Sequence, residues 1–232
     1  MLKNKRILVV DDEEKIVRVL EAYLQKEDFE VLKAYSGKDA LELFSNNQID
    51  LVILDLMLLD VSGEQVCKEI RKTSRVPIIM LTAKSTEEDL LNGLALGADD
   101  YIYKPFSPRT VIAKTKAVLR RVSNDALMGE TKQFDNLMIN FSSTEVKKNG
   151  ETILLTPTEF KILLTLAKAP GRTFTRDQLI DFALDGNFDG FDRSIDTYIK
   201  SLRKKIEDDR KNPKFVKTVR GMGYKFGGNK WN

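Results

Sequence analysis

Five polar side chains in the first half of the chain stand where short apolar runs end. Asp11 and Asp12 follow the first run, Asp55 ends the third, Thr82 ends the fourth and Lys104 follows the fifth. Carboxylates that converge at one place repel each other and raise at least one pKa, unless a divalent cation lies among them. An all-oxygen site with a few carboxylates and open positions suits Mg²⁺.

A carboxylate nucleophile, Mg²⁺, a hydroxyl and a lysine are together what an aspartyl-phosphate site needs. Each residue alone has an ordinary interpretation, because an Asp pair after a strand more often caps a helix. The five together favour phosphoryl chemistry with Asp55 as the nucleophile. The sequence contains no histidine, so a phosphohistidine donor would have to belong to a partner.

The apolar runs alternate with segments of helical period, which predicts an α/β domain. The runs cover residues 7–10, 29–32, 49–54, 76–81 and 101–102. Five strands alternating with five helices indicate a doubly wound parallel sheet with right-handed crossovers. If the strand order is the flavodoxin-like 2-1-3-4-5, the first and third strands are neighbours. Asp11, Asp12 and Asp55 then converge in one cleft at the carboxyl ends of the strands.

A change of pattern divides the chain into two predicted domains. Residues 1–121 form the α/β domain, residues 122–132 lose the periodicity and are predicted to be a linker, and residues 133–232 form a second domain. Charge is also unevenly distributed along the chain. Residues 193–232 hold 12 Lys and Arg against 4 Asp and Glu, whereas the remainder of the chain is net acidic. Such a concentration of basic charge makes nucleic acid the leading partner class.

The second domain is predicted to be an α+β winged helix-turn-helix. Short alternating segments indicate strands at 134–141, 145–148 and 151–155, with Asn149-Gly150 as a hairpin turn. Thr156 and Glu159 form a capping box at the start of a first helix. A second helix is expected from near Thr175, a third at 192–207, and a closing hairpin at 215–226.

The predicted third helix is amphipathic and basic. One stripe is apolar and would pack on the domain core, namely Ile195, Tyr198, Ile199, Leu202 and Ile206. A basic face alone is usually a solvated face. Because this one follows a helix-turn-helix spacing and precedes a basic hairpin, we expect it to enter a DNA groove. The predicted DNA contacts are Arg193, Thr197, Lys200, Arg203 and Lys204 on the helix and Arg220 at the hairpin tip.

Other classes of protein are disfavoured by composition. The apolar stretches are too short for a membrane span or a signal-peptide core, so a cytoplasmic location is expected. Cys67 is the only cysteine, which excludes an intrachain disulfide and makes it a predicted small core residue on a helix. The absence of histidine excludes Ser-His-Asp chemistry and HExxH zinc sites.

The sequence resembles two-component response regulators of the OmpR/PhoB subfamily over nearly its whole length. Seven motifs in the family's order carry the resemblance. Those that match the receiver pattern are residues 7–13, 55–58, 81–83 and 97–106, and those that match the effector pattern are residues 155–160, 193–206 and 218–226. The resemblance implies a receiver domain followed by a DNA-binding domain.

The resemblance also implies roles for individual residues. Asp55 would accept a phosphoryl group from a sensor histidine kinase. Mg²⁺ would be bound by Asp12, Asp55 and the backbone carbonyl of Met57, with Asp11 contributing directly or through water. Lys104 would contact the phosphoryl group, and the Lys104-Pro105 peptide would be cis. Thr82 would move toward the new phosphate and Tyr101 would turn inward behind it, shifting a two-state equilibrium.

Some positions depart from the family pattern. Leu59 stands where a proline is common, and Val61-Ser62-Gly63 replaces a frequent Met-Asp-Gly, so the loop after Asp55 would be less rigid and the phosphoryl lifetime altered. The family dimerises through its fourth helix, fifth strand and fifth helix. Leu90 and Thr110 would lose one salt bridge of that face. Charges suited to the face remain at Asp99, Asp100, Lys114 and Arg121.

Phosphorylation would then promote a homodimer that binds tandem half-sites in promoter DNA and contacts RNA polymerase. Two alternatives remain. A Mg²⁺-dependent phosphohydrolase of the haloacid-dehalogenase type would need a second Asp two residues after its nucleophile, where this chain has Met57. A regulator of the same fold that is independent of phosphorylation is disfavoured by the intact set of five polar residues. We therefore expect a regulator and not an enzyme.

Overall fold

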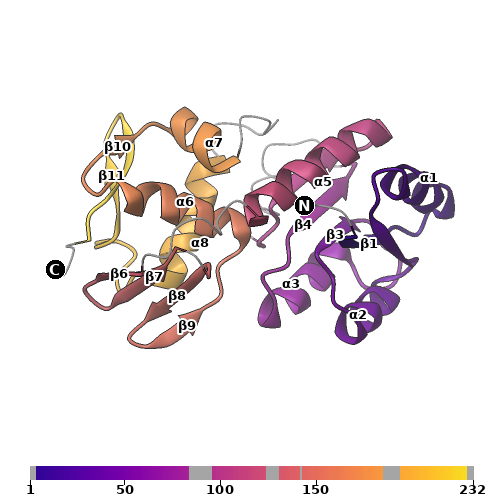
Figure 1. Cartoon of the computed structure of the whole chain (residues 1–232), viewed down its shortest axis with the longest axis horizontal. Helices are drawn as coiled ribbons and strands as arrows, with labels where there is room; N and C mark the ends of the chain where they lie inside the picture. Colours follow the sequence, from indigo (N-terminus) through magenta and orange to yellow (C-terminus); the bar gives the residue numbers. More distant parts are fainter. Residues whose placement is uncertain (1–3, 84–95, 124–130, 142, 185–193, 229–232) are drawn as a thin grey trace. The chain divides into compact units, whose positions relative to one another are not determined.

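The structure is a computed structural model that describes residues 4–83, 96–123, 131–141, 143–184 and 194–228. The chain divides into two compact units, Met1–Arg120 and Arg121–Asn232 (Figure 1). Among the described residues no helix is long and apolar enough to cross a membrane.

The first unit contains a five-stranded sheet with all strands parallel. The strands are β1 (Arg6–Val10), β2 (Glu30–Ala34), β3 (Leu51–Asp55), β4 (Ile78–Thr82) and β5 (Asp100–Tyr103). Their order is β2-β1-β3-β4-β5, which confirms the predicted topology. β1 and β3 are neighbours in a register that pairs Val10 with Leu54. The ends of these two strands therefore lie side by side at one edge of the sheet.

Helices cover both faces of this sheet. They are α1 (Glu14–Gln25), α2 (Gly37–Asn46), α3 (Gly63–Thr73) and α5 (Pro108–Ser123). One hydrophobic core joins α1 and α5 to the sheet through buried residues such as Leu20 and Val118. α2 and α3 pack beside each other on the opposite face (Figure 1). The fourth predicted helix falls in residues 84–95, outside the described residues.

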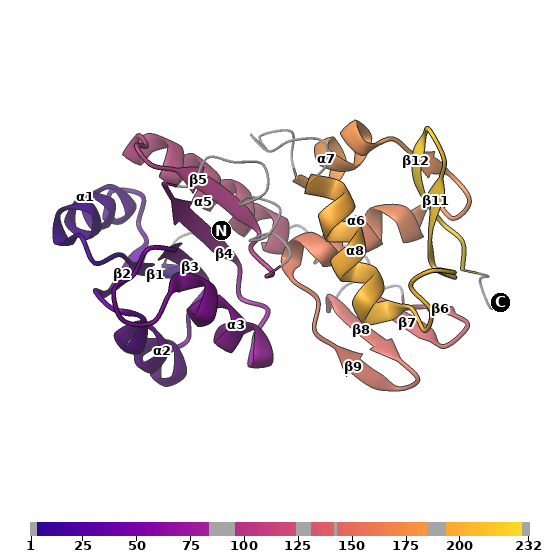
Figure 2. The ribbon, with the colours of Figure 1, turned by 180° about the vertical axis from the view of Figure 1, so that it is seen from behind.

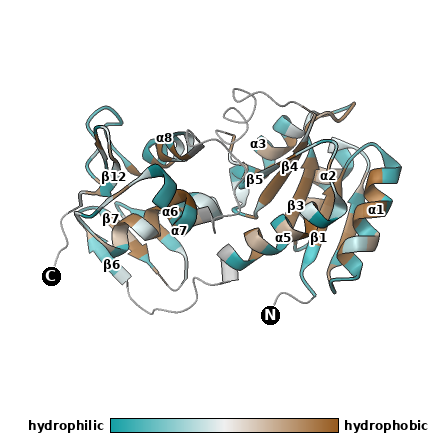
Figure 3. Cartoon of the chain, turned by 90° about the horizontal axis from the view of Figure 1, so that it is seen from above, coloured by the Kyte–Doolittle hydropathy of each residue, from teal (hydrophilic) through white to brown (hydrophobic). Residues whose placement is uncertain are grey.

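The central strands are buried on both faces. Every residue of β3 and of β4 is buried, and these strands are coloured as hydrophobic in Figure 3. A run of four apolar residues that does not alternate with polar ones fits this position, because helices exclude water from both sides of a doubly wound sheet. Asp55 closes β3 and shares its burial, so the strand fixes the position of this carboxylate.

The described residues of the second unit form two antiparallel sheets and three helices, and the unit has the predicted winged-helix architecture. The first sheet has the order β6 (Thr131–Phe134), β7 (Leu137–Asn140), β8 (Glu145–Lys148), β9 (Glu151–Ile153). α6 (Pro157–Lys168), α7 (Arg176–Leu184) and α8 (Ser194–Ile206) follow. The second sheet places β12 (Gly223–Phe226) between β10 (Thr173–Phe174) and β11 (Val216–Val219).

The core of the second unit forms where α6 and α8 cross (Figure 2). The predicted apolar stripe of α8 is confirmed, since Ile195, Tyr198, Ile199, Leu202 and Ile206 are all buried. The rings of Phe134 and Phe226 meet edge to face, with centroids 4.7 Å apart, and connect the two sheets. The opposite side of α8 consequently faces away from this core.

Several predicted boundaries differ from the structure. The expected strand 134–141 instead contains the last residue of β6, a turn and β7. The chain turns there because Asp135 adopts a left-handed φ of 50°, which Asp tolerates better than most residues. α5 extends to Ser123 and β6 begins at Thr131, so both ends of the expected linker 122–132 belong to regular elements. β10 was missed because two residues are too short for a visible alternation.

Candidate functional site

Three carboxylates converge at the ends of β1 and β3, as the strand order predicts. Oxygens of Asp11, Asp12 and Asp55 all lie within 4.8 Å of one another. Asp11 is 0% exposed and Asp55 is 2% exposed, whereas Asp12 is half-buried. Two like charges in so little water are unfavourable, so each needs a compensating cation or donor.

Lys104 provides that compensation within the chain. Its Nζ lies 2.8 Å from Asp11 Oδ2 and 2.8 Å from Asp55 Oδ2, so one ammonium group donates to both buried acids. The side chain is only 17% exposed. Its backbone N–H donates to the carbonyl of Thr82 at 2.7 Å, which aligns the loop after β5 with the end of β4. The Lys104-Pro105 peptide is cis, which confirms the prediction.

Burial and ion pairing oppose each other in setting the protonation of this cluster. Burial raises the pKa of Asp11 and outweighs the hydrogen bonds from Lys104 and from the Glu13 amide, which lower it. Burial lowers the pKa of Lys104, but its hydrogen bonds to Asp11 and Asp55 outweigh this and leave the pKa raised. The lysine is therefore charged at neutral pH, and it is one cation beside three acidic side chains.

Backbone amides hold the remaining carboxylate oxygens. The Met57 N–H donates to Asp55 Oδ1 at 3.2 Å, and the Glu13 N–H donates to Asp11 Oδ1 at 2.9 Å. Each buried acid thus has one oxygen on Lys104 and the other on the amide two residues later. The carboxylates are oriented before any ligand arrives, and their oxygens are of the type that a hard divalent cation prefers.

Thr82 and Tyr101 lie on the strands next to the acids. β3 pairs with β4 so that Asp55 faces Leu81, which places Thr82 one residue beyond, where it is buried. Tyr101 on β5 is also buried, and its hydroxyl donates to the sulfur of Met80 at 2.9 Å. The inward orientation that the family resemblance associates with phosphorylation is the one in this structure. The switching roles of both residues stay predictions.

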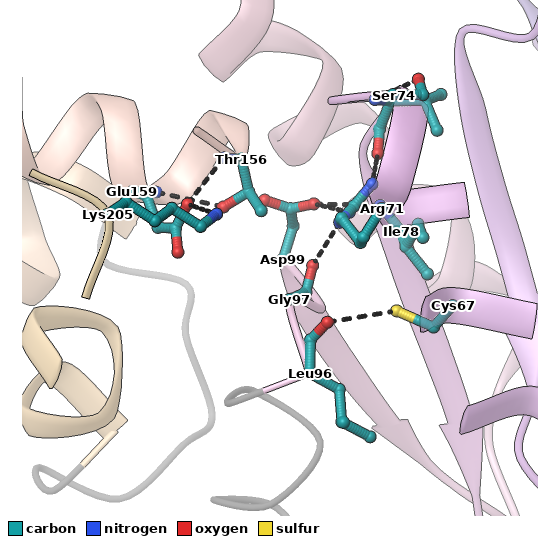
Figure 4. Close-up of polar contacts among 11 residues, drawn as sticks. Cys67, Arg71, Ser74, Ile78, Leu96, Gly97, Asp99, Thr156, Glu159 and Lys205 are labelled. Atoms are coloured by element: carbon teal, nitrogen blue, oxygen red, sulfur yellow. Dashed lines mark hydrogen bonds and ion pairs between the residues drawn. The ribbon is translucent and has the colours of Figure 1, made fainter. Parts of the chain in front are cut away.

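The residues proposed for a dimer face are bonded within the chain. Asp99 is fully buried and accepts from Arg71 Nη2 and from the Ile78 N–H, each at 3.0 Å (Figure 4). Asp100 accepts from Lys114 Nζ at 2.9 Å, and both side chains are buried. Within a single chain these three charges are therefore paired internally, and their role in a dimer face stays a prediction. Charges at the start of a strand covered by helices lose their water and must be paired locally.

The other residues of that face are less constrained. Arg121 lies in α5, and Thr110 is exposed near the start of the same helix. Leu90 lies outside the described residues.

Part of the basic face predicted on α8 is exposed, and its contact with DNA stays a prediction. Lys200 and Lys204 are exposed and Thr197 is half-buried, on the side opposite the apolar stripe. Arg220 is exposed at the turn between β11 and β12. Arg193 lies outside the described residues. These positions leave three basic side chains accessible to a polyanion on the helix and the hairpin.

Arg203 differs from this group. Its Nε and Nη2 donate to the carbonyl of Val216 at 2.9 and 2.7 Å, and Nη2 also donates to Thr218 Oγ1 at 2.9 Å. The guanidinium lies 5.6 Å from the ring centroid of Tyr224. Burial lowers the pKa of Arg203. In this structure Arg203 thus connects α8 to the hairpin, and its contact with DNA stays a prediction.

Two buried carboxylates in this unit were not predicted to reach α8 and the hairpin. Glu159 accepts from Ser201 at 2.6 Å and from Lys205, in addition to the Thr156 amide of its capping box (Figure 4). Glu207 accepts from the N–H groups of Phe215 and Val216 at 3.0 and 2.8 Å. The capping box was visible in the sequence, whereas no local signal indicated the contacts with distant residues.

A second ion pair, together with a tyrosine, joins α7, α8 and β12. Arg176 donates to both oxygens of Asp196, at 2.7 and 3.2 Å, and the Tyr224 hydroxyl donates to the same carboxylate at 2.8 Å. Burial, followed by this hydrogen bond, raises the pKa of Tyr224 to about 12. The helices and the hairpin are therefore held in one arrangement by charged groups as well as by the core.

Comparisons with known proteins agree with both units. Residues 7–116 match the response regulator receiver domain, and residues 150–226 match the C-terminal domain of transcriptional regulatory proteins. The chain belongs to the response regulators of the OmpR/PhoB type. It is a transcriptional regulator with a receiver and a winged-helix domain.

Individual relatives cover nearly the whole chain. The alkaline phosphatase synthesis transcriptional regulatory protein PhoP of Bacillus subtilis is 43% identical over 96% of both chains. The transcriptional regulatory protein AfsQ1 of Streptomyces coelicolor is 39% identical over 94% of this chain and 96% of its own. A solved structure of a RitR mutant has a TM-score of 0.81 at 28% identity, covering 96% of this chain and 99% of its own. The response regulator DrrB of Thermotoga maritima, described as an OmpR/PhoB homolog, has a TM-score of 0.52 at 36% identity, covering 97% and 100%.

Proposed function

We propose that Asp55 accepts a phosphoryl group from a phosphohistidine of a partner sensor kinase and that this modification controls binding of the regulator to promoter DNA. The observation that carries the proposal is the contact of Lys104 Nζ with both Asp55 and Asp11 at 2.8 Å, in a cluster of three carboxylates. An Asp55 oxygen would form the bond to phosphorus as the bond to the histidine nitrogen breaks. The chain contains no histidine, so the donor is another protein.

The carboxylate cluster fits Mg²⁺. Asp12 and Asp55, the backbone carbonyl of Met57 and, directly or through water, Asp11 would hold the ion. Bound there, it would offset negative charge on the phosphoryl oxygens. The fit rests on the oxygen donors, which lie within 4.8 Å of one another, and on the excess negative charge that one lysine leaves. Stronger metal binding above the pKa of Asp11 is the corresponding expectation.

The chain's own residues would do the rest. Lys104 is close enough to Asp55 to transfer its hydrogen bond to a phosphoryl oxygen after the reaction, while it keeps the one to Asp11. Thr82 lies one residue past Leu81, the β4 residue that pairs with Asp55. Its hydroxyl would donate to a second phosphoryl oxygen. Tyr101 would exchange between inward and outward orientations, and phosphorylation would shift this population toward the inward one, behind Thr82.

The output is proposed to be DNA binding in the cytoplasm by a phosphorylation-stabilised homodimer that contacts RNA polymerase. Thr197, Lys200, Lys204 and Arg193 would contact the major groove or its phosphates, and Arg220 the backbone or minor groove. Dimerisation would use α5 and its surroundings, where Lys114 and Asp100 would exchange their intrachain contact for one with a second subunit and Arg121 would add charge. The burial of Asp99 does not support a role for that residue.

Turnover of outside substrates is not part of the proposal. A phosphohydrolase needs a proton donor for the leaving group, and the position that would carry it holds Met57, whose thioether cannot transfer a proton. A regulator that ignores phosphorylation would have no use for a buried acid cluster, whose electrostatic cost is offset by Lys104.

The proposal is tested by Asp55→Asn in the full chain. We expect this variant to take no radioactively labelled phosphoryl group, either from a cognate kinase or from acetyl phosphate with Mg²⁺. The variant should keep its wild-type fold, because the carboxamide has nearly the same shape. Asp39→Asn, which removes an exposed acid from the first turn of α2, serves as the control and should retain label. Persistent labelling of Asp55→Asn would show that another residue is the acceptor.

A further inference from the structure

The carboxylate of Asp60 connects the loop after β3 to the start of α2. One oxygen accepts from the Gly37 N–H at 2.8 Å and the other from the Lys38 N–H at 3.1 Å. These amides belong to the first turn of α2 and have no acceptor within the helix. Ser36 caps the next amide, that of Asp39, at 3.1 Å. Asp60 therefore completes the capping of a helix from a distant part of the chain.

Electrostatics are consistent with a firm contact. The amides of Gly37, Val61 and Lys38 lower the pKa of Asp60 to about 2. The positive end of the α2 dipole favours the same charged form. Space around the contact is tight, since a Cβ on Gly37 would lie 2.4 Å from the carbonyl oxygen of Val61. Only glycine allows the loop to approach the helix this closely.

The other end of the loop is fixed against Asp55 itself. The Gly63 N–H donates to the carbonyl of Leu56 at 3.2 Å, which closes the loop at its base. A Cβ on Gly63 would lie 2.0 Å from the carbonyl oxygen of Asp55. Ser62 caps α3 by accepting from the Gln65 N–H at 3.3 Å. The loop is thus held at its base by glycine packing and at its tip by Asp60.

Between these two anchors the side chain of Leu58 is buried, at 8% exposed, but its two neighbours are not. The side chain of Leu59 is 90% exposed and that of Met57 is 58% exposed, so packing restrains neither residue. Leu59 also lacks the fixed φ of a proline. Met57 nevertheless has to keep its N–H on Asp55 Oδ1. On the far side of Met57, the packing of Leu58 restrains the chain first, and the hydrogen bonds of Asp60 to α2 hold it next.

We propose that Asp60 is a positioning residue for the Asp55 site. By anchoring the loop to α2, Asp60 sets the path of the backbone at Met57. That path fixes the position of the Met57 N–H, which orients Asp55, and of the Met57 carbonyl, which is assigned to the cation. This inference rests on the proposed function and deepens it. It assigns control of cation affinity and phosphoryl lifetime to an acid that contacts neither the cation nor the phosphoryl group.

The test compares Asp60→Ala, Asp60→Asn and the wild type as full-length proteins by amide NMR, with MgCl₂ as the probe. Asp60→Ala removes both acceptors, so the Gly37 and Lys38 amides should shift. The Met57 amide should shift with them, and the Kd for Mg²⁺ should rise by roughly fivefold, the factor equivalent to losing one helix cap. Asp60→Asn keeps one acceptor oxygen, so its amide shifts and its Kd for Mg²⁺ should fall between those of the wild type and of Asp60→Ala.

Asp39→Asn is the matched control, because it removes an exposed acid from the first turn of the same helix. It should leave the Met57 amide and the Kd for Mg²⁺ at wild-type values. If Asp60→Ala shifts Gly37 and Lys38 but leaves Met57 and the Kd unchanged, the positioning role is wrong. Should Asp60→Ala fail to fold, the same comparison is made with Asp60→Asn.

A phosphoryl lifetime measurement separates this inference from the proposed function. After labelling with acetyl phosphate, the half-life of the Asp55 phosphate should change by at least about twofold in Asp60→Ala and remain unchanged in Asp39→Asn. A wild type that takes no label overturns the proposed function. In that case the Met57 amide still decides whether Asp60 positions the loop.

Discussion

The ammonium group of Lys104 offsets the charge of two buried carboxylates at once. Because its side chain is mostly buried and 2.8 Å from both Asp11 and Asp55, its removal would leave like charges facing each other with little water. At the scale of single residues, this makes Lys104 the point at which stability and phosphoryl chemistry depend on the same atoms.

Lys104→Met should therefore lower the free energy of unfolding of the first unit at pH 7 by roughly 2 kcal/mol. This is less than the cost of breaking a fully buried ion pair, because protonation of Asp11 relieves part of the repulsion between the carboxylates. Urea unfolding measures the change. Lys15→Met removes an exposed lysine from α1 and should have little effect.

The pH dependence of this loss has a defined sign. The pKa of Asp11 is already above its ordinary value of 3.8 in the folded chain. A raised folded pKa gives stability that is present below the unfolded pKa and lost as pH rises through the folded one. Without Lys104 the folded pKa rises further, so the difference from wild type should shrink as pH falls toward 4. A deficit that stays constant from pH 7 to pH 4 would contradict this account.

At the scale of elements, α8 has two kinds of basic residue. Lys200 is exposed, whereas Arg203 is bonded to the Val216 carbonyl and to Thr218 on the hairpin. A phosphate contact releases a counterion when it forms, whereas a contact inside the protein does not. The two residues should therefore respond differently to salt when each is replaced.

Lys200→Met should leave stability within about 0.5 kcal/mol of wild type. It should lower the slope of log affinity against log salt by about one unit. Arg203→Met should lower stability by roughly 1 to 3 kcal/mol, because the carbonyl of the buried Val216 loses its donor. Its salt slope, measured on the folded fraction, should stay at the wild-type value. A slope reduced by Arg203→Met would restore that residue to the DNA surface.

At the scale of the whole molecule, phosphorylation at one unit must change what the other does with DNA. Each unit has its own core, so the coupling is most simply carried by association of two chains. Two winged-helix units on one face of the duplex would read half-sites about one helical turn apart, roughly 10 base pairs.

Sedimentation of the protein with acetyl phosphate and Mg²⁺ should therefore show a dimer at concentrations where the untreated protein is a monomer. Asp55→Asn should remain monomeric under both conditions. Footprinting of the phosphorylated wild type should protect two half-sites in tandem. Protection of one isolated half-site, or equal dimerisation by Asp55→Asn, would count against this arrangement.

Much of the fold followed from patterns that are local in sequence. Apolar runs of four residues predicted the buried strands β1 and β3, and helical spacing predicted the buried stripe of α8. Parallel strands end at the same edge of a sheet, so the position of Asp55 after its strand was enough to predict its meeting with Asp11. Residue type and period therefore determined the fold class and the acid cluster.

The contacts of polar side chains between elements were decided only by the tertiary structure. Arg203 turns to a carbonyl 13 residues away, and Asp60 reaches the amide of Gly37, 23 residues earlier. Asp99, predicted for a dimer face, is buried against Arg71. Periodicity tells which face of an element is apolar, but it does not tell which distant donor lies across from a charged side chain. That choice depends on how the elements pack, because a charge that loses its water has to find its partner among the groups that packing brings near.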